Sequence, residues 1–279
     1  MTPERVVSPQ AVPTIDTATW SRPADLHLVA APATTASSAP ARLLLLSEFL
    51  LLFIGIPLAL FFRLASKLPP LPVLWLVAVF CFWTLWRDPT FDRRQLWNAA
   101  PLRQQLPQIL ALFFAGVAVV TILVHQYAPD LFLILLRTHP RAWAMIIAAY
   151  PIFSVYPQGL IYRVFFFHRY RPLLAAGVPS AKSVVALKPN ASPIGASVWE
   201  LGPQTRDWLM ILVSAATFAL MHILFRNWIA LALTFPGGIL FARRYLDTRS
   251  LCISSLEHAL YGCFLFTIGL GQFFYVRVV

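Results

Sequence analysis

The sequence predicts an all-α protein, a polytopic membrane bundle of about seven or eight transmembrane helices. Of its 279 residues, 59% are hydrophobic and only 12% are charged, whereas a soluble domain carries about twice that charged share. Apolar segments long enough to cross a bilayer, about 20 residues each, recur along the chain. A lipid bilayer is therefore the expected surrounding of most of the chain.

Candidate spans follow an N-terminal tail, residues 1–41, that is rich in Pro, Ala, Ser and Thr and is predicted to be disordered. The tail lacks the apolar core of a signal peptide, so no cleavage is expected. The candidate spans are residues 43–62, 71–86, 106–124, 143–167, 208–225, 228–242 and 251–276. The run 131–137 is too short to cross, and is expected to lie in the membrane interface or to extend the fourth span. An eighth span would lie within 131–167 or at the end of the chain.

The spans fall into two groups. Residues 42–142 hold the N-terminal spans, and residues 143–279 are predicted to form a C-terminal membrane core. Within that core, a proline-containing connection at about 180–207 is expected to be an irregular, water-exposed loop.

The basic residues indicate topology rather than a nucleic-acid partner. The net charge is +11, and the Lys and Arg residues cluster between the apolar runs. With the tail inside, the inner segments hold fifteen of them and the outer segments six. By the positive-inside rule the N-terminus is expected in the cytoplasm, with the chain in the cell (inner) membrane.

Ionisable side chains inside spans are functional candidates by default, because they are costly in lipid and face the bundle interior or a wet cavity. Six residues meet this description: Glu48, Arg163, His168, His222, Glu257 and His258.

Arg163 lies in a strongly apolar run, next to the hydroxyl of Tyr162. Pro151 and Pro157 precede it, and a proline within a span frees a backbone carbonyl and kinks the helix. A kinked helix with a buried arginine is typical of the lining of a cavity. The alternative is that Arg163 extends its charge to the cytoplasmic headgroups.

Two histidines lie on later spans. His222 follows Phe218 by one turn, and the alternative for a lone histidine is a neutral core residue with a hydrogen bond. His258 has the small residues Ser254 and Gly262 four positions away, so another group can approach its ring closely. In straight spans the two rings would differ by about 15 Å in depth, at a rise of about 1.5 Å per residue.

Three short motifs follow one another on successive spans: Gln158-Gly159-x-x-x-Arg163, Phe218-x-x-x-His222 and His258-x-x-x-Gly262. Their order and spacing resemble the CPBP family of intramembrane endopeptidases, the CAAX proteases and bacteriocin-processing enzymes. The family pattern is Glu-Glu-x-x-x-Arg, Phe-x-x-x-His and His-x-x-x-Asn. The resemblance covers roughly residues 143–276.

The resemblance implies an endopeptidase that hydrolyses a peptide bond of a membrane-associated protein or peptide substrate. In the family, a glutamate of the first motif activates water with help from the histidines, and an asparagine or histidine stabilises the oxyanion. Arg163, Phe218, His222 and His258 match the family pattern. His222, His258 and Arg163 are therefore candidate catalytic residues. The motif positions Gln158 and Gly159 are included with them, and Phe218, Tyr162 and Gly262 are candidate supporting residues.

The first and last motifs depart from the family. Gln158 and Gly159 replace the two glutamates, and Gly262 replaces the asparagine. Gln158 can orient a water molecule but cannot take its proton, so the family's general base is missing. Glu257 or Glu48 would have to replace this general base, approaching the site from another direction.

Other chemistry stays open around the histidines. Asn227 is an alternative oxyanion donor. We expect no cofactor; the rival is a zinc ion held by two histidines and a carboxylate, but the chain has no His-Glu-x-x-His motif.

Two alternatives to catalysis also follow from the sequence. The missing glutamates favour an inactive, protease-like scaffold that binds membrane segments of partner proteins. A small transporter is the third hypothesis, because Pro236 with Gly237-Gly238 would break the sixth span, as transporter helices are often broken.

Overall fold

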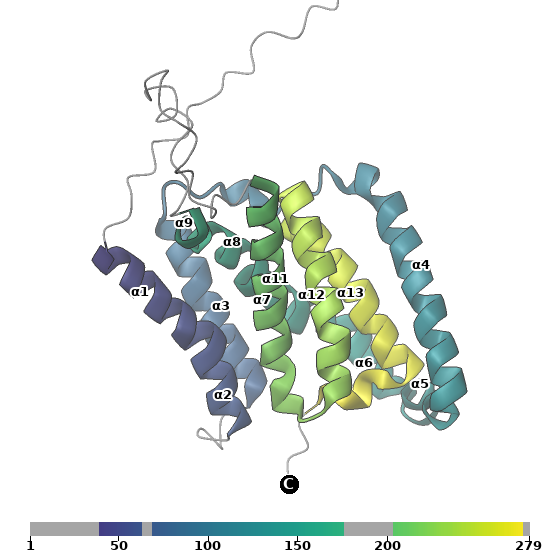
Figure 1. Ribbon diagram of the computed structural model, residues 1–279. Coiled ribbons are helices and arrows are strands. Elements are labelled where there is room, and N and C mark those ends of the chain that lie inside the picture. The colour runs from purple at the N-terminus through teal and green to yellow at the C-terminus, as the bar shows by residue number, and fades with distance from the viewer. Residues whose placement is uncertain (1–38, 63–68, 176–202, 276–279) are drawn as a thin grey trace, which may run out of the picture. The chain divides into compact units, whose positions relative to one another are not determined.

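The computed structural model describes residues 39–62, 69–175 and 203–275 (Figure 1). Within these ranges the regular elements are all helical, which confirms the predicted all-α class. Seven helices are long and apolar enough to cross a membrane: Pro40–Phe61, Pro70–Arg87, Leu102–Tyr127, Pro140–Arg169, Gln204–Phe225, Trp228–Thr248 and Leu251–Ile268. Each contains or overlaps one of the seven predicted spans.

The first three spans come from the N-terminal group. Span one consists of α1 (Ala39–Leu50), the π-helical turn η1 (Leu51–Gly55) and α2 (Ile56–Phe61). Spans two and three are α3 (Pro70–Arg87) and α4 (Leu102–Tyr127), with the short turn η2 (Arg93–Leu96) between them.

The fourth span is a composite of five segments: α6 (Pro140–Tyr150), η4 (Pro151–Val155), α7 (Tyr156–Gly159), η5 (Leu160–Phe165) and α8 (Phe166–Arg169). The short helix α9 (Arg171–Ala175) follows it. Spans five to seven are α11 (Pro203–Met221) with the 3-10 turn η6 (His222–Phe225), α12 (Trp228–Thr248) and α13 (Leu251–Ile268).

In Figure 1, α11, α12 and α13 lie side by side in the middle of these helices, with α4 at one edge and α1 at the other. Large apolar side chains on the outer faces are exposed, as expected for helices that face lipid. The aromatic core lies between span one and the end of span four, where Phe53 packs edge-on against Phe166 and Tyr170.

A proline stands two residues after each of the π-helical turns η1 and η4: Pro57 in span one and Pro157 in span four. Pro157 cannot donate to the carbonyl of Phe153, four residues earlier, and its ring crowds that carbonyl, so the helix widens into η4 just before it. The indole Nε1 of Trp75 donates to the Phe153 oxygen at 3.0 Å. The carbonyl that a proline was predicted to free is thus that of Phe153, and a neighbouring span binds it.

The run 131–137 does not extend the fourth span. Most of it forms the short helix α5 (Ile134–Thr138), which ends before α6 begins at Pro140. The amide of Leu133 donates to the carbonyl of Ile268 at 3.1 Å, so this segment packs beneath the end of α13. No eighth span is found in the described ranges.

Two predicted ends were wrong. The last span stops at Ile268 rather than 276, because Gly269 has a φ of 110° and turns the chain out of the helix. The sixth span continues to Thr248 and is not broken after Pro236. A Cβ on Gly238 would lie 2.9 Å from the Cα of Ala215, so this glycine serves close packing of α12 on α11.

The predicted disordered tail lies almost wholly outside the described residues, as does most of the predicted loop at about 180–207. The described chain resumes inside the predicted loop range, because α11 begins at Pro203. Proline is well suited to the first turn of a helix, where its missing N–H is not needed.

Candidate functional site

Phe218 joins the three motifs. Its ring, on α11, is 1% exposed. The guanidinium carbon of Arg163 lies 4.5 Å from the ring centroid, and the imidazoles of His222 and His258 lie 4.8 and 5.4 Å from it. The structure therefore brings together the arginine and both histidines that the sequence singled out.

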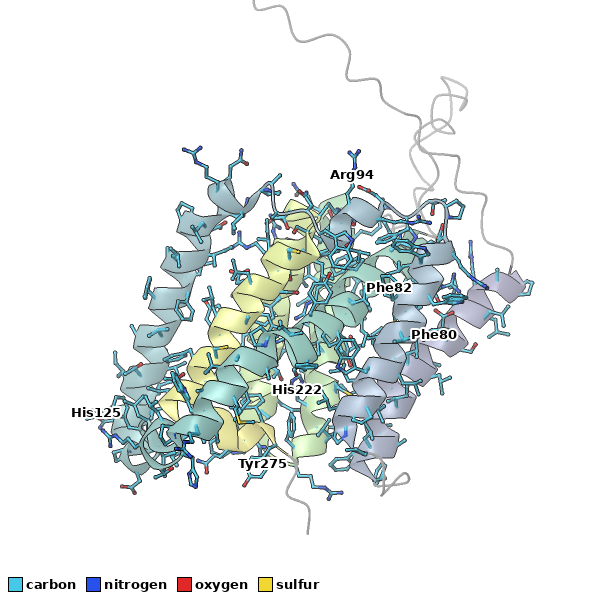
Figure 2. The ribbon with its side chains drawn as sticks, turned by 180° about the vertical axis from the view of Figure 1, so that it is seen from behind. Phe80, Phe82, Arg94, His125, His222 and Tyr275 are labelled. Atoms are coloured by element: carbon cyan, nitrogen blue, oxygen red, sulfur yellow. The ribbon has the colours of Figure 1, made fainter. Side chains whose placement is uncertain are left out.

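The expected difference in depth between the histidines is absent, since both rings contact the same phenylalanine. His222 stands at the end of α11, where the helix tightens into η6 (Figure 2). Arg163 lies in the π-helical segment η5, whose wide turn changes the direction of its side chains. The carbonyl of Tyr162 in this segment accepts a 2.6 Å hydrogen bond from Ser214 on α11.

Arg163 is buried and has no hydrogen-bond partner in the described part of the chain. Its side chain is 1% exposed, so it does not reach the headgroups. The guanidinium faces the rings of Phe218 and Phe241, at 4.5 and 5.3 Å. Its Nε, Nη1 and Nη2 atoms have no hydrogen-bond partner among the described residues. A buried charge without a counter-ion is unfavourable by several kcal/mol. A negatively charged atom beside the guanidinium would therefore be stabilised.

The hydrogen bond of His222 fixes its tautomer. Nδ1 lies 2.8 Å from the carbonyl oxygen of Phe218. Because a carbonyl only accepts, Nδ1 carries the proton, and Nε2 keeps a lone pair that can accept one. His222 is thus a partly buried histidine with a hydrogen bond, as in the alternative interpretation, and it also retains a basic nitrogen.

His258 is held between aromatic rings. It stacks on Phe241 with centroids 4.5 Å apart and an interplanar angle of 20°. Its Nδ1 is buried without a hydrogen-bond partner among the described residues, and its Nε2 lies 3.3 Å from the hydroxyl of Tyr150. The close approach predicted for this ring is therefore present.

Tyr150, at the end of α6, was not singled out from the sequence. The available signal was Gly262, one turn after His258. The Tyr150 ring fills the space next to this glycine, and a Cβ at position 262 would lie 2.5 Å from the Tyr150 hydroxyl oxygen. The side chain missing from the third motif is replaced in space by a tyrosine from another span.

Gln158 and Gly159 occupy different surroundings. Gln158 donates to the Ser154 hydroxyl at 2.7 Å, and its Oε1 is buried without a partner among the described residues. A Cβ on Gly159 would lie 2.6 Å from Leu251 Cδ1 and 2.8 Å from Ser255 Oγ, both on α13. Position 159 therefore has no room for a carboxylate unless these side chains move.

The two carboxylates that could replace the missing general base both form ion pairs away from Phe218. Glu257 is fully buried in a bidentate ion pair with Arg244, with N–O distances of 2.9 and 3.1 Å. Glu48 pairs with Arg169 at 2.9 Å and accepts from the hydroxyl of Tyr170, also at 2.9 Å. Both acids are held by arginines outside the contacts around Phe218.

Asn227 and Tyr162 have supporting positions. The side chain of Asn227 caps α12 by accepting from the amide of Ala230 at 2.8 Å, and it donates to the carbonyl of Phe273, also at 2.8 Å. Both ends of its amide are therefore occupied. Tyr162 packs edge-on against Phe218, with centroids 5.4 Å apart.

The described residues contain no group of three His, Cys, Asp or Glu side chains placed to hold a metal ion. The two histidines at Phe218 come together with an arginine and a tyrosine rather than with a carboxylate.

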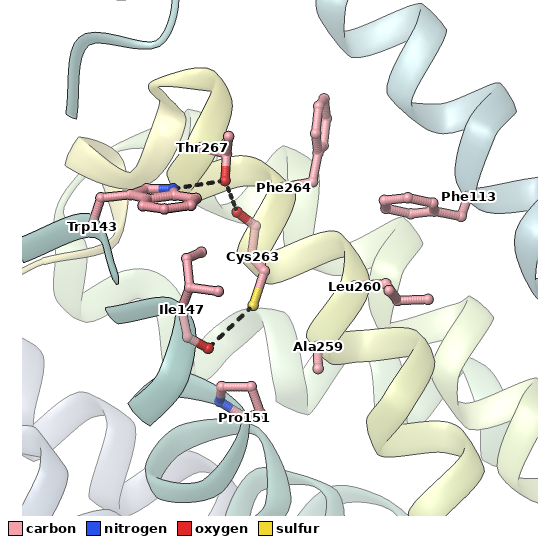
Figure 3. A pocket seen from close by; sticks show the side chains of 9 residues that line it. All are labelled: Phe113, Trp143, Ile147, Pro151, Ala259, Leu260, Cys263, Phe264 and Thr267. Atoms are coloured by element: carbon pink, nitrogen blue, oxygen red, sulfur yellow. Dashed lines mark hydrogen bonds between the residues drawn. The ribbon is translucent and has the colours of Figure 1, made fainter. Parts of the chain in front are cut away.

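An apolar pocket of about 480 Å³ lies next to the site (Figure 3). It is formed by α4, α6, the start of η4 and α13. Its lining includes Pro151 and Ala259, the chain neighbours of Tyr150 and His258. The remaining lining residues are Phe113, Trp143, Ile147, Leu260, Cys263, Phe264 and Thr267.

Comparison with known proteins gives one match. Residues 140–264 match the family model described as type II CAAX prenyl endopeptidase Rce1-like. No curated protein and no solved structure matches the chain. The matched segment, less than half of the chain, contains Arg163, His222 and His258 together with Tyr150. With its seven apolar helices, the chain is an integral membrane protein. This match confirms the resemblance to the CPBP family over residues 140–264.

Proposed function

We propose that the protein is an intramembrane endopeptidase that hydrolyses a peptide bond of a membrane-associated protein or peptide. The observation that carries this proposal is the buried guanidinium of Arg163, which has no hydrogen-bond partner among the described residues and shares the Phe218 ring with His222 and His258. A positive charge with free donors beside two imidazoles suits a reaction that develops an oxyanion.

His222 is the proposed general base. Its Nε2 lone pair takes a proton from a water molecule while the water oxygen bonds to the scissile carbonyl carbon. The proton then passes to the leaving nitrogen as the C–N bond breaks. The Nδ1 hydrogen bond to Phe218 supports this role by holding the tautomer. Gln158, whose Oε1 has no partner among the described residues, is the proposed acceptor that orients the water.

Arg163 is the proposed stabiliser of the oxyanion. Its donors are already buried beside the Phe218 and Phe241 rings. In such surroundings a fixed charge stabilises a developing anion far better than it does in water.

The substrate is proposed to be membrane-associated. The pocket beside the site is lined by apolar and aromatic side chains from three spans, which supports an apolar segment of the substrate lying there. The neighbouring catalytic groups would then act on a bond close to that segment.

For topology, we propose a cytoplasmic N-terminus in the cell (inner) membrane. The excess of Lys and Arg on one set of connections supports it. Labelling of single cysteines placed in the 88–101 and 128–139 connections with an impermeant maleimide tests this. Only cysteines in 88–101 should be protected in intact cells.

The competing function is an inactive scaffold of the same fold. It is favoured by Gln158 and Gly159, and by the ion pairs that occupy Glu48 and Glu257. This protein would bind membrane segments without cleaving them.

Cleavage of a fluorogenic membrane-spanning peptide in proteoliposomes distinguishes the peptidase from the inactive scaffold. We expect the unmodified protein to cleave, and His222→Ala or His258→Ala to slow cleavage by about 100-fold or more. His168→Ala is the matched control, because His168 binds Asp88 at 2.8 Å and makes none of the contacts around Phe218.

A second set of variants tests the missing carboxylate. Gln158→Glu changes one atom and keeps the shape of the side chain, whereas Gly159→Glu needs Leu251→Ala beside it for space. If only a variant with a restored glutamate cleaves, the protein is a disabled protease, and the scaffold is the correct reading. If the unmodified protein cleaves and His222→Ala abolishes that activity, the peptidase stands.

A further inference from the structure

The motif His258-x-x-x-Gly262 has no polar side chain at its last position, and Tyr150 from another span fills the space beside that glycine. Gly262 has no side chain to offer, and Tyr150 lies so close that a Cβ at position 262 would be 2.5 Å from the tyrosine hydroxyl. Tyr150 and any larger residue at position 262 therefore exclude each other in this arrangement.

The tyrosine hydroxyl is bound to the site rather than merely near it. It lies 3.3 Å from Nε2 of His258, and the two rings meet at 89°. The Tyr150 ring also packs edge-on against Phe266, with centroids 5.2 Å apart. A hydroxyl fixed in this way needs little reorganisation to bind a ligand atom.

We propose that Tyr150 is a catalytic residue, and that its hydroxyl donates the hydrogen bond to the oxyanion that an amide at position 262 would otherwise supply. The inference rests on the proposed function, because it assigns one donor in that reaction.

A phenol can make both contacts at once. Its oxygen accepts from Nε2–H of His258, and its own proton is then directed to the carbonyl oxygen of the substrate. No proton is transferred; the hydrogen bond strengthens as the carbonyl carbon becomes tetrahedral and negative charge gathers on the oxygen. Tyr150 would supply a directed donor and Arg163 the charge, which together make a two-part oxyanion site.

The first test compares Tyr150→Phe with Tyr156→Phe in the full-length protein, using the fluorogenic membrane-spanning peptide. Both changes remove one partly buried, hydrogen-bonded hydroxyl from the same span, and Tyr156 donates to the carbonyl of Leu96 at 3.1 Å, away from His258. We expect kcat to fall by about 100-fold to 1000-fold in Tyr150→Phe. KM should change by less than about threefold, since the lost contact forms only in the transition state. Tyr156→Phe should keep the kcat of the unmodified protein.

The second test exchanges the donors. Tyr150→Ala clears the space beside position 262, and adding Gly262→Asn then places an amide one turn from His258. The double variant should regain at least about tenfold in kcat over Tyr150→Ala alone. Gly262→Asn alone should inactivate the protein, because its side chain meets the Tyr150 ring.

The outcomes separate this inference from the function on which it rests. An active unmodified protein whose Tyr150→Phe variant keeps full kcat would overturn the role of Tyr150 and leave the peptidase intact. A double variant no better than Tyr150→Ala would overturn the equivalence of the two donors. Failure of the unmodified protein to cleave any membrane-spanning peptide would overturn both proposals.

Discussion

Arg244 and Glu257 form a bidentate ion pair inside the bundle, with N–O distances of 2.9 and 3.1 Å, and both side chains are nearly inaccessible. The pair joins α12 to α13. Arg244 Nη1 also donates to the side-chain oxygens of Gln105 and Gln108, so the pair connects α4 to the same core. Glu257 is therefore a structural residue rather than a free base.

Glu257→Ala should destabilise the fold by about 3–5 kcal/mol, because it leaves the Arg244 charge buried without a partner. The free energy of unfolding in mixed micelles measures this. Arg243→Ala is the control: the neighbouring pair with Asp247 is exposed and should contribute no more than about 1 kcal/mol. Equal effects of the two substitutions would contradict the structural role.

The sequence predicts the membrane architecture well because hydrophobicity acts over whole segments. Each of the seven apolar runs corresponds to a helix among the described residues, and the wrong ends were those of the sixth and seventh spans, which stop at Thr248 and Ile268. Arg163, His222 and His258 could be found because polar residues stand out in apolar spans. Arg244 was counted with the topological charges, since α12 was expected to end before it.

Tyr150 shows where sequence reasoning stops. Its hydroxyl is one polar atom on an aromatic ring in an apolar run, and its partner His258 lies 108 positions away. Nothing local marks that contact; only the small residue at position 262 indicated that something would approach. Likewise, the surroundings of the Arg163 guanidinium, which finds no hydrogen-bond partner in the part of the chain that the structure describes, are a property of packing that no motif records.

Gly238 should not tolerate a larger side chain. Its Cβ would lie 2.9 Å from the backbone of Ala215, so Gly238→Leu must push α11 and α12 apart, and we expect a loss of about 1–3 kcal/mol. Gly237→Ala is the matched control, because its Cβ would meet only the movable ring of Phe241 at 3.2 Å. Thermal unfolding compares the two; an unchanged midpoint in Gly238→Leu would contradict the close packing.

Asn227 should contribute to stability and not to the chemical step. Asn227→Ala removes the cap of α12 and the hydrogen bond to Phe273, which should destabilise the protein by about 1–2 kcal/mol. Cleavage per folded molecule should stay within about threefold of the unmodified protein. A large fall in kcat with unchanged stability would instead make Asn227 an oxyanion donor.

Arg163 should contribute to the chemical step and not to stability, the opposite of Asn227. Arg163→Leu replaces a buried charge that has no hydrogen-bond partner among the described residues, and the new side chain packs against Phe218 and Phe241. The free energy of unfolding should therefore stay the same or rise by about 1–4 kcal/mol, while cleavage is lost. Arg244→Leu makes the same chemical change but leaves Glu257 unpaired, so it should destabilise the fold. Measuring stability and cleavage for both variants decides the matter. If Arg163→Leu destabilises the protein as much as Arg244→Leu does, Arg163 has a structural partner, and its guanidinium is not available to bind the substrate.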